Sequence, residues 1–245
     1  MRLDKYLSFC LVKSRQDVKK LIKNKKVSVN DQIITKEDFK VNENQDVVVC
    51  DNERVIYQEF TYVVLNKPAG YVTSTKDSEP TVMELLPAKY SKLSPVGRLD
   101  KDTEGLLLFT NDGQTAHNLT SPKKDINKVY YVELLNDVED SLINVFKDGI
   151  ILDDGYHTKP ALLKIIDRNK VYLTISEGKF HQVKRMFMSV NNKVTYLRRI
   201  KFGNLTLDET LKQGMAFVAD SNGKVLTEKI LPVLEEIRNS RKRFF

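Results

Sequence analysis

Apolar side chains recur at helical spacing near the start of the chain and in short, strand-like runs along the rest. A first helix is predicted after Ser14, a good N-cap, by apolar residues at the spacing of one helix face: Val18, Leu21 and Ile22. Residues 25–34 predict two short strands joined by the turn pair Asn30-Asp31. The pattern therefore predicts a small N-terminal unit with a helix followed by a short sheet.

Beyond residue 60, apolar runs that predict strands alternate with turns. These runs cover residues 61–66, 106–111, 129–135, 170–176 and 215–220. Candidate helices lie between them, near residues 114–120, 139–147 and 181–190. Many strands with few helices predict an α+β fold, with a mixed, largely antiparallel β-sheet flanked by helices.

A change of composition marks the expected domain boundary. Residues 50–59 are polar and show no clear period, so a linker is predicted over 49–59. It would join a small domain, 1–48, to a larger one, 60–235, followed by a basic tail over 236–245. The tail contains Arg238, Arg241, Lys242 and Arg243. A solvated, disordered end is expected there, although these cations could also contact nucleic acid.

The composition excludes several classes of protein. The chain of 245 residues has no apolar run near the ~18 residues of a membrane-spanning helix. Its first segment is a poor secretory signal, because Asp4 and Ser8 interrupt it. The two cysteines, Cys10 and Cys50, define neither a disulfide framework nor a zinc site. These features predict a cytoplasmic protein without membrane contact.

The positive charge is concentrated at the N-terminus. Residues 1–30 carry nine cations and two anions, whereas the remaining 215 residues carry equal numbers of each. On the predicted helix, four cations form a stripe beside the apolar face: Arg15, Lys19, Lys23 and Lys26. Such a ridge favours docking to a polyanion, since neutralised phosphates release counterions. A solvated lysine-rich face is the alternative that composition alone leaves open.

The chain shows none of the usual cofactor motifs. It has neither a phosphate-binding G-x-x-x-x-G-K-[ST] loop nor a dinucleotide-binding G-x-G-x-x-G after a strand. It also has no G-x-S-x-G nucleophile elbow. His117, His157 and His181 lie far apart with no cysteines nearby, so no metal site is expected. Any chemistry here is expected to need neither a cofactor nor a metal.

Residues 97–108 are the most informative stretch for chemistry. Gly97 and Gly105 bracket a charged loop that runs into an apolar strand. In an extended backbone, Arg98 and Asp100 point to one side and Leu99 to the other. From these residues alone, a turn or capping role for Asp100 is favoured over a catalytic one, because most aspartates in such loops have that role.

The N-terminal segment resembles the S4 RNA-binding domain over residues 1–48. The likeness lies in residues 2–7, Ser14-Arg15, Leu21-Ile22 and 27–30. It implies the S4 (α-L) fold, two helices followed by a short antiparallel sheet, which grips structured RNA by its backbone. The residues it assigns to RNA are Arg2, Lys5, Arg15, Lys19, Lys23 and Lys26.

Residues 97–113, GRLDKDTEGLLLFTNDG, resemble the signature of the RsuA/RluA superfamily of RNA pseudouridine synthases. Further segments follow in the same order as in that family: 66–71, 128–132 and 177–187. The resemblance implies the pseudouridine synthase fold and an isomerase, with Asp100 as the catalytic aspartate and Tyr130 beside it. It also implies a basic partner for Asp100. Spacing favours Lys184 for this partner but leaves Arg185 open.

The same resemblance suggests roles for other residues around Asp100. Arg98 would fill the space that an extruded uridine leaves, because guanidinium planes stack on bases. Arg185, His181 and Gln182 would contact RNA, although His181 and Gln182 could instead cap a helix. No cofactor is implied, because uridine and pseudouridine have the same atomic composition.

The N-terminal S4-like segment together with GRLD points to the RsuA group, where Lys184 replaces the arginine of most relatives. This implies small-subunit (16S) ribosomal RNA as the substrate, in an assembling particle. A monomer is expected only by default. Two alternatives remain: the RluB/RluE/RluF branch, acting on large-subunit (23S) RNA, and a non-catalytic S4-type RNA-binding protein. An S4-linked methyltransferase would need a Gly-rich adenosylmethionine loop, and none is visible.

Overall fold

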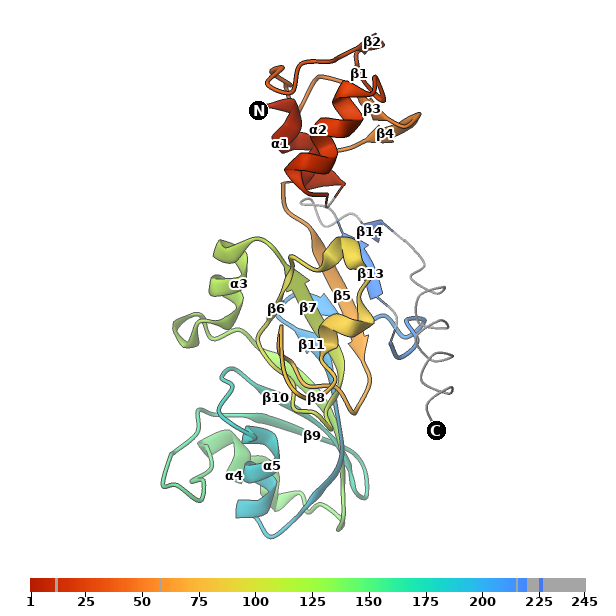
Figure 1. Ribbon diagram of the computed structural model, residues 1–245. Coiled ribbons are helices and arrows are strands. Elements are labelled where there is room, and N and C mark those ends of the chain that lie inside the picture. The colour runs from red at the N-terminus through yellow and green to blue at the C-terminus, as the bar shows by residue number, and fades with distance from the viewer. Residues whose placement is uncertain (12, 58, 215, 220–224, 227–245) are drawn as a thin grey trace, which may run out of the picture. The chain divides into compact units, whose positions relative to one another are not determined.

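The computed structural model describes residues 1–11, 13–57, 59–214, 216–219 and 225–226. The chain divides into two compact units, Met1–Phe60 and Thr61–Phe245 (Figure 1). The basic tail expected over 236–245 lies outside the described residues. No helix of the described segments has both the length and the apolar character needed to cross a bilayer.

The N-terminal unit packs two helices against a small antiparallel sheet. Its helices are α1 (Leu3–Cys10) and α2 (Arg15–Lys23). The sheet order is β2-β1-β3-β4, formed by β1 (Val27–Val29), β2 (Gln32–Ile33), β3 (Val48–Cys50) and β4 (Glu53–Val55). As expected, the Ser14 side chain accepts a hydrogen bond from the Asp17 amide and caps α2. Asn30 and Asp31 both have positive φ, as a two-residue hairpin turn requires.

The linker expected over 49–59 is wrong for most of its length. Residues 48–55 form the β3–β4 hairpin, which turns at Asp51 and Asn52, both at positive φ. Val55 is buried, and Tyr57 packs on Tyr6 with ring centroids 5.6 Å apart. Strands of three residues are too short for an alternating pattern to stand out, which is why this stretch resembles a linker in the sequence.

The second unit is built on one long mixed sheet. Its order is β14-β13-β5-β7-β11-β8-β10-β9, with β6 added to β7 and β12 to β11. Among the described strands only β7 and β11 pair in parallel, so the expected, largely antiparallel sheet is confirmed. The strands are β5 (Tyr62–Lys67), β6 (Ser94–Val96), β7 (Glu104–Thr110), β8 (Lys128–Leu134), β9 (Leu162–Asp167), β10 (Lys170–Ile175), β11 (Val194–Phe202), β12 (Leu205–Thr206), β13 (Ala216–Ala219) and β14 (Val225–Leu226).

Helices flank this sheet near the positions that the sequence predicts. They are α3 (Gly113–Thr120), α4 (Ser141–Asp148) and α5 (Gln182–Ser189), with short 3-10 turns η1 (Val82–Leu85), η2 (Ala88–Tyr90) and η3 (Pro122–Lys124). Phe146 of α4 packs on Phe187 of α5, with ring centroids 4.9 Å apart. Both rings are fully buried in the core of this unit, so α4 and α5 are held together by apolar contacts.

The parallel contact between β7 and β11 sets the position of the charged loop 97–103. At Gly105 a Cβ atom would lie 2.2 Å from the carbonyl oxygen of Arg199, and Gly105 has a φ of +100°. Only glycine tolerates both the approach and the backbone angle. Since loop 97–103 runs directly into β7, this contact holds the loop beside β11 and its neighbour β8.

Candidate active site

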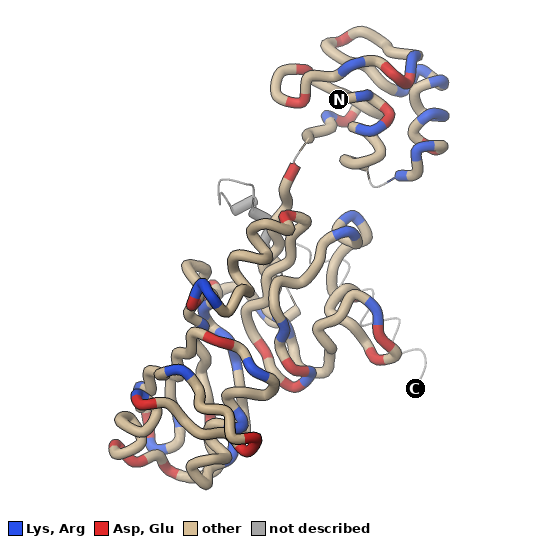
Figure 2. Tube along the Cα trace, turned by 90° about the vertical axis from the view of Figure 1, so that its left-hand side faces the viewer, with Lys and Arg blue, Asp and Glu red and all other residues tan. Residues whose placement is uncertain are grey.

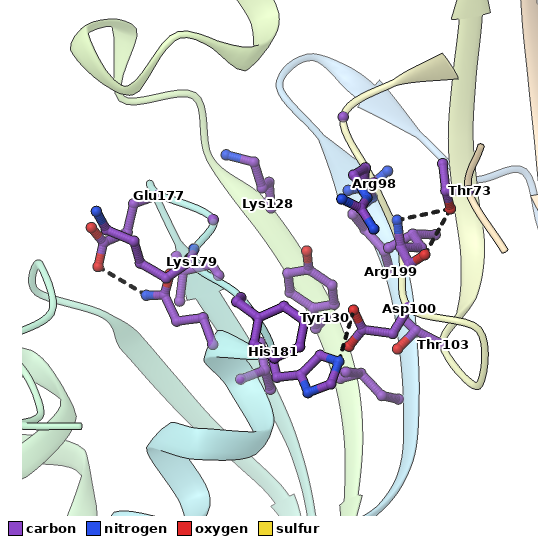
Figure 3. A pocket seen from close by; sticks show the side chains of 18 of the residues that line it. Thr73, Arg98, Asp100, Thr103, Lys128, Tyr130, Glu177, Lys179, His181 and Arg199 are labelled. Carbon is purple, nitrogen blue, oxygen red and sulfur yellow. Dashed lines mark hydrogen bonds and ion pairs between the residues drawn. The ribbon is translucent and has the colours of Figure 1, made fainter. Parts of the chain in front are cut away.

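A cavity of about 520 Å³ opens beside loop 97–103 (Figure 3). Its walls come from this loop, from β8, from the loop 176–181 and from the start of α5. A volume of this size lies within the ~300–1,000 Å³ typical of small-molecule pockets. The side chains around it include Arg98, Asp100, Lys128, Tyr130, Lys179, His181 and Lys184. Charged groups of both signs therefore line one open cavity.

The loop alternates as the sequence predicts, because Arg98 is exposed, Leu99 is buried and Asp100 is half-buried at the cavity. Thr73 holds the backbone of Leu99 by two hydrogen bonds. Its Oγ1 donates to the Leu99 carbonyl at 2.7 Å and accepts from the Leu99 amide at 3.1 Å. Gly97 enters the loop with a φ of +71°, in the left-handed region that favours glycine.

Lys67 supports the same loop from beneath. Its side chain is fully buried at the end of β5. The ammonium lies 3.1 Å from the Asp100 carbonyl oxygen, 2.8 Å from that of Thr103 and 3.1 Å from that of Pro68. Burial is the main cause that lowers the pKa of Lys67 to about 8. These backbone contacts tie the aspartate loop to β5.

The Asp100 carboxylate faces two side chains of the α5 region. Its Oδ2 lies 3.3 Å from the ammonium of Lys184, and its Oδ1 lies 3.6 Å from Nε2 of His181. Asp102 also binds Lys184, at 2.5 Å, but its side chain is 71% exposed. Partial burial works to raise the pKa of Asp102, but the hydrogen bond and charge of Lys184 lower it below its ordinary value. Lys184 thus bridges two carboxylates of one loop.

Tyr130 lies on β8 at the back of the cavity and is only 8% exposed. In Figure 3 its ring stands beside Asp100 and His181, and its hydroxyl points into the pocket. A flat, fixed ring next to a carboxylate offers a stacking surface and a phenol to a planar ligand. The structure therefore brings together Asp100, Tyr130 and Lys184, which the sequence proposes as one site.

The upper wall of the cavity is cationic. Arg98 is exposed there, whereas Arg199 of β11 is buried and donates through Nε to the Leu106 carbonyl at 2.8 Å. Lys128 donates to the Ile126 carbonyl at 2.9 Å. Burial, helped by the charge of Arg199, lowers the pKa of Lys128 to about 8. These cations suit an anionic ligand. Among the described residues no group of three or more His, Cys, Asp or Glu side chains could hold a metal ion.

Comparison with known families gives this arrangement its context. Residues 61–189 match the family described as RNA pseudouridylate synthase, and residues 1–47 match the S4 domain. The first match covers more than half of the chain and contains Asp100, Tyr130 and Lys184. The chain belongs to the RsuA family of RNA pseudouridine synthases.

Individual relatives agree with this assignment along nearly the whole chain. An uncharacterised RNA pseudouridine synthase of Bacillus subtilis is 40% identical over 96% of this chain and 99% of its own. The ribosomal small subunit pseudouridine synthase A of Yersinia pestis is 43% identical, over 87% and 92% of the two chains. The ribosomal small subunit pseudouridine synthase A of Escherichia coli is 42% identical, over 87% of this chain and 94% of its own. A crystal structure of a pseudouridylate synthase superposes with a TM-score of 0.64 at 37% identity. The match covers 97% of this chain and 98% of that one.

Of the two basic residues that the sequence leaves open, Lys184 is the one that contacts Asp100 in this RsuA-family chain. Arg185 turns away and pairs with Asp153 and with Asp154, the latter at 2.7 Å. Both are exposed acids, so Arg185 is neutralised within its own part of the structure. Its Nη1 also lies 3.4 Å from the Phe180 carbonyl oxygen. We therefore assign Arg185 to holding loop 176–181 rather than to direct RNA contact.

The expected RNA contact of Gln182 does not agree with its surroundings. The side chain is 3% exposed, its Nε2 donates to Glu177 at 2.9 Å, and its Oε1 accepts from the Lys179 amide at 2.8 Å. Glu177 in turn accepts from the Tyr156 hydroxyl at 2.8 Å. Since both ends of its amide are occupied, Gln182 fixes the loop before α5. His181 stands at the N-cap of α5 without a capping bond and lines the cavity.

Some of the N-terminal cations expected to bind RNA are exposed, whereas others are paired with carboxylates. Figure 2 shows Lys and Arg recurring along the N-terminal unit. Arg15 and Lys23 are exposed on α2, and Lys5 is exposed on α1. Lys19 instead pairs with Glu37 at 2.8 Å, and Arg2 forms two 3.0 Å hydrogen bonds with the buried carboxylate of Asp4.

Lys26 is not part of the predicted helical stripe. The helix ends at Lys23, and Lys26 lies beyond it, paired with Asp51 at 3.0 Å. The chain leaves the helix through Asn24 and Lys25, and Lys25 has a φ of +59°, so helical spacing no longer applies at Lys26. Among the described residues, the exposed cations of α2 that form no ion pair are therefore Arg15 and Lys23.

Sequence reasoning assigns no role in the site to Lys67, Thr73, Glu177 or Phe180, although all but Thr73 lie in the family-like segments 66–71 and 177–187. Lys67 ends an apolar strand, and a lysine is seldom buried unless its ammonium is paired, so the residue type alone does not reveal its buried position. Thr73 and Glu177 act on backbone groups far away in the chain, which no local pattern reveals.

Proposed function

We propose that this enzyme converts a specific uridine of small-subunit (16S) ribosomal RNA to pseudouridine, with Asp100 as the catalytic carboxylate. The reaction breaks the bond between N1 of uracil and C1′ of ribose, rotates the base and joins C5 to C1′, while C5 loses its proton to water and N1 gains one. The observation that carries the proposal is the position of the Asp100 carboxylate, inside the cavity and 3.3 Å from the Lys184 ammonium. No cofactor enters the scheme, because substrate and product are isomers.

Lys184 supplies the charge that this carboxylate needs. An aspartate acts as a nucleophile or base only when ionised, and a partly dry pocket favours the neutral acid. A cation within ~4–6 Å favours the charged form. Lys184 meets that distance and is itself only 22% exposed, so water screens the pair weakly.

Base flipping brings the uridine to the cavity. A paired and stacked uridine cannot reach Asp100, so it must be extruded, at a cost of a few kcal/mol. The extruded uracil stacks on Tyr130, which lies next to Asp100. Arg98, which is exposed at the rim and has no hydrogen bond or ion pair within the described parts of the chain, enters the vacated stack.

The small-subunit substrate is supported by the relatives that are named ribosomal small subunit pseudouridine synthase A. We propose a monomeric, cytoplasmic enzyme that acts on an assembling particle. Large-subunit (23S) RNA, as in the RluB/RluE/RluF branch, is the second candidate substrate. A non-catalytic S4-type RNA-binding protein is disfavoured, since Asp100, Tyr130 and Lys184 lie together around one cavity.

Tritium release tests the proposal. The substrate is small-subunit rRNA labelled with [5-³H]uridine, offered as naked RNA and as a partly assembled particle, with labelled large-subunit rRNA in parallel. We expect the wild type to release label from the small-subunit RNA and Asp100→Asn to release none while still binding RNA. Asp137→Asn makes the same change at a side chain that is 72% exposed, and it should turn over normally. Equal release by Asp100→Asn would refute the catalytic assignment, and release from large-subunit RNA alone would replace the substrate.

A further inference from the structure

Phe180 is an apolar ring in an unusual place. It lines the cavity and yet keeps 73% of its surface exposed. Nearby rings of the same unit, such as Phe146 and Phe187, are fully buried. The proposed chemistry at Asp100 gives Phe180 no role, and its packing does not explain its position.

Phe180 is stacked on His181. The ring centroids lie 3.7 Å apart and the ring planes differ by 22°. His181 has a φ of +49°, a left-handed conformation that non-glycine residues rarely adopt and that tends to occur at functional sites. Nε2 of His181 lies 3.6 Å from Oδ1 of Asp100 (Figure 3). The two rings thus form a stack beside the carboxylate, in which each ring covers one face of the other and Phe180 remains largely exposed.

The backbone beneath this pair is held at several points. Gln182 binds both Glu177 and the Lys179 amide. Arg185, fixed by Asp154, lies within hydrogen-bond distance of the Phe180 carbonyl. An exposed ring on a fixed backbone loses little conformational freedom when a ligand covers it, which favours binding.

The surroundings identify the chemistry of the ligand. The same cavity also presents the cations Lys179, Lys128 and Arg98, in addition to Lys184, which pairs with Asp100 and Asp102. Aromatic faces within a positively charged groove are the pattern that binds single-stranded nucleic acid, since bases stack on the rings while cations contact phosphates. A nucleobase therefore fits this surface better than an apolar peptide side chain does.

We infer that the stacked Phe180–His181 pair is a platform for the base next to the extruded uridine. This inference rests on the proposed function. The depth of the rings separates their roles: Tyr130 is 8% exposed at the back of the cavity, whereas Phe180 is 73% exposed at its mouth. The extruded uracil covers the deep ring, and a neighbouring base of the same strand covers the outer pair.

The test begins by mapping the pseudouridine that the wild type forms in small-subunit rRNA. A short RNA with that site is then the substrate on which three variants are assayed: Phe180→Ala, Phe180→Leu and Phe180→Trp. Leucine keeps the apolar character and removes the flat π face, whereas tryptophan keeps both. Met188→Ala is the control, because Met188 is 65% exposed on α5 and does not line the cavity. Circular dichroism verifies that each variant is folded.

We expect Phe180→Ala and Phe180→Leu to raise KM about 5- to 100-fold, the usual effect of losing one base–aromatic stack. At saturating RNA, kcat should change less than about 3-fold, and Phe180→Trp and Met188→Ala should resemble the wild type. A KM for Phe180→Leu equal to that of the wild type overturns the platform. If the wild type forms no pseudouridine, the proposed function fails, and the platform fails with it.

A second measurement uses 2-aminopurine, whose fluorescence is quenched by stacking, placed on either side of the mapped uridine. The wild type should quench one of the two labels, and Phe180→Leu should restore its emission at saturating enzyme. Equal emission from both enzymes at both positions overturns the inference while leaving the turnover result intact.

Discussion

The ammonium of Lys184 lies 3.3 Å from Oδ2 of Asp100, although 84 residues separate the two in the sequence. The contact depends on two supports. Loop 97–103 is held by Lys67 and Thr73, and the start of α5 is held by the Glu177–Gln182 pair. Charge pairing at the site therefore depends on contacts from several parts of the domain.

Lys184→Met should lower kcat about 10²–10³-fold, the usual cost of removing one preorganised charge from an active site. Lys184→Arg should recover part of the loss, because it restores a cation beside Asp100. The measurement is steady-state tritium release over a range of RNA concentrations, which gives kcat and KM separately. A rise in KM with an unchanged kcat would instead identify Lys184 as a phosphate contact.

Gly105→Ala should destabilise the domain by at least about 2–3 kcal/mol, because a Cβ atom there would lie 2.2 Å from the Arg199 carbonyl at an unfavourable φ. Urea unfolding measures the effect. Gly155→Ala is a matched control, since Gly155 also has a positive φ of +80° but open space around it. If the two variants lose the same stability, then backbone strain explains the loss and the contact with β11 does not.

Several elements of the fold follow from local sequence, and others depend on distant contacts. Ser14 and the apolar spacing after it predict α2, because capping and helical periodicity act within a few residues. Strand β11, with the sequence VTYLRRIKF, escapes prediction because it carries three cations. One of them, Arg199, is buried by its bond to the Leu106 carbonyl and its position over Phe202.

The site is predicted in the same uneven way. Asp100, Tyr130 and Lys184 follow from the family resemblance, and the structure places them around one cavity. Gln182 and Arg185 belong to the same motif as Lys184, but their side chains bind other groups of the protein, namely Glu177 and Asp154. A motif gives the residue types near a site, whereas the direction of each side chain depends on partners such as Glu177 and Asp154, which no local pattern identifies.

Lys67 should make stability depend on pH. Burial lowers its pKa to about 8 in the folded protein, while the unfolded chain keeps a lysine pKa near ~10.4. Between these values the unfolded state binds more protons, so this group makes the free energy of unfolding rise with pH. Lys67→Met should lack that rise. Urea unfolding of both proteins at pH 7.5 and 9.5 checks the difference, and a parallel response of the two would contradict the assignment.

Lys128 should make RNA binding weaken as the pH rises. Burial and the charge of Arg199 lower its pKa to about 8, so the free enzyme loses this cavity cation as the pH passes that value. KM should therefore rise between pH 7.5 and 9 in the wild type. Lys128→Met should show a higher KM throughout and a flatter profile. A rise of the same size in both proteins would mean that another group titrates.

The N-terminal unit should determine the salt dependence of RNA binding. Arg15 and Lys23 are exposed on α2 and have no ion pair within the described residues, whereas Lys19 is paired with Glu37. A free cation that neutralises a phosphate releases counterions, so each loss should reduce the slope of log K against log salt by about 0.7–1. Arg15→Gln and Lys23→Gln should each do so, and Lys19→Gln should do so less.

Lys164→Gln removes the same charge from exposed β9, outside the cavity, and should leave the slope unchanged. Fluorescence anisotropy between 50 and 300 mM salt measures the slopes. If Lys164→Gln and Lys23→Gln have equal effects, overall charge, and not the α2 ridge, attracts the RNA.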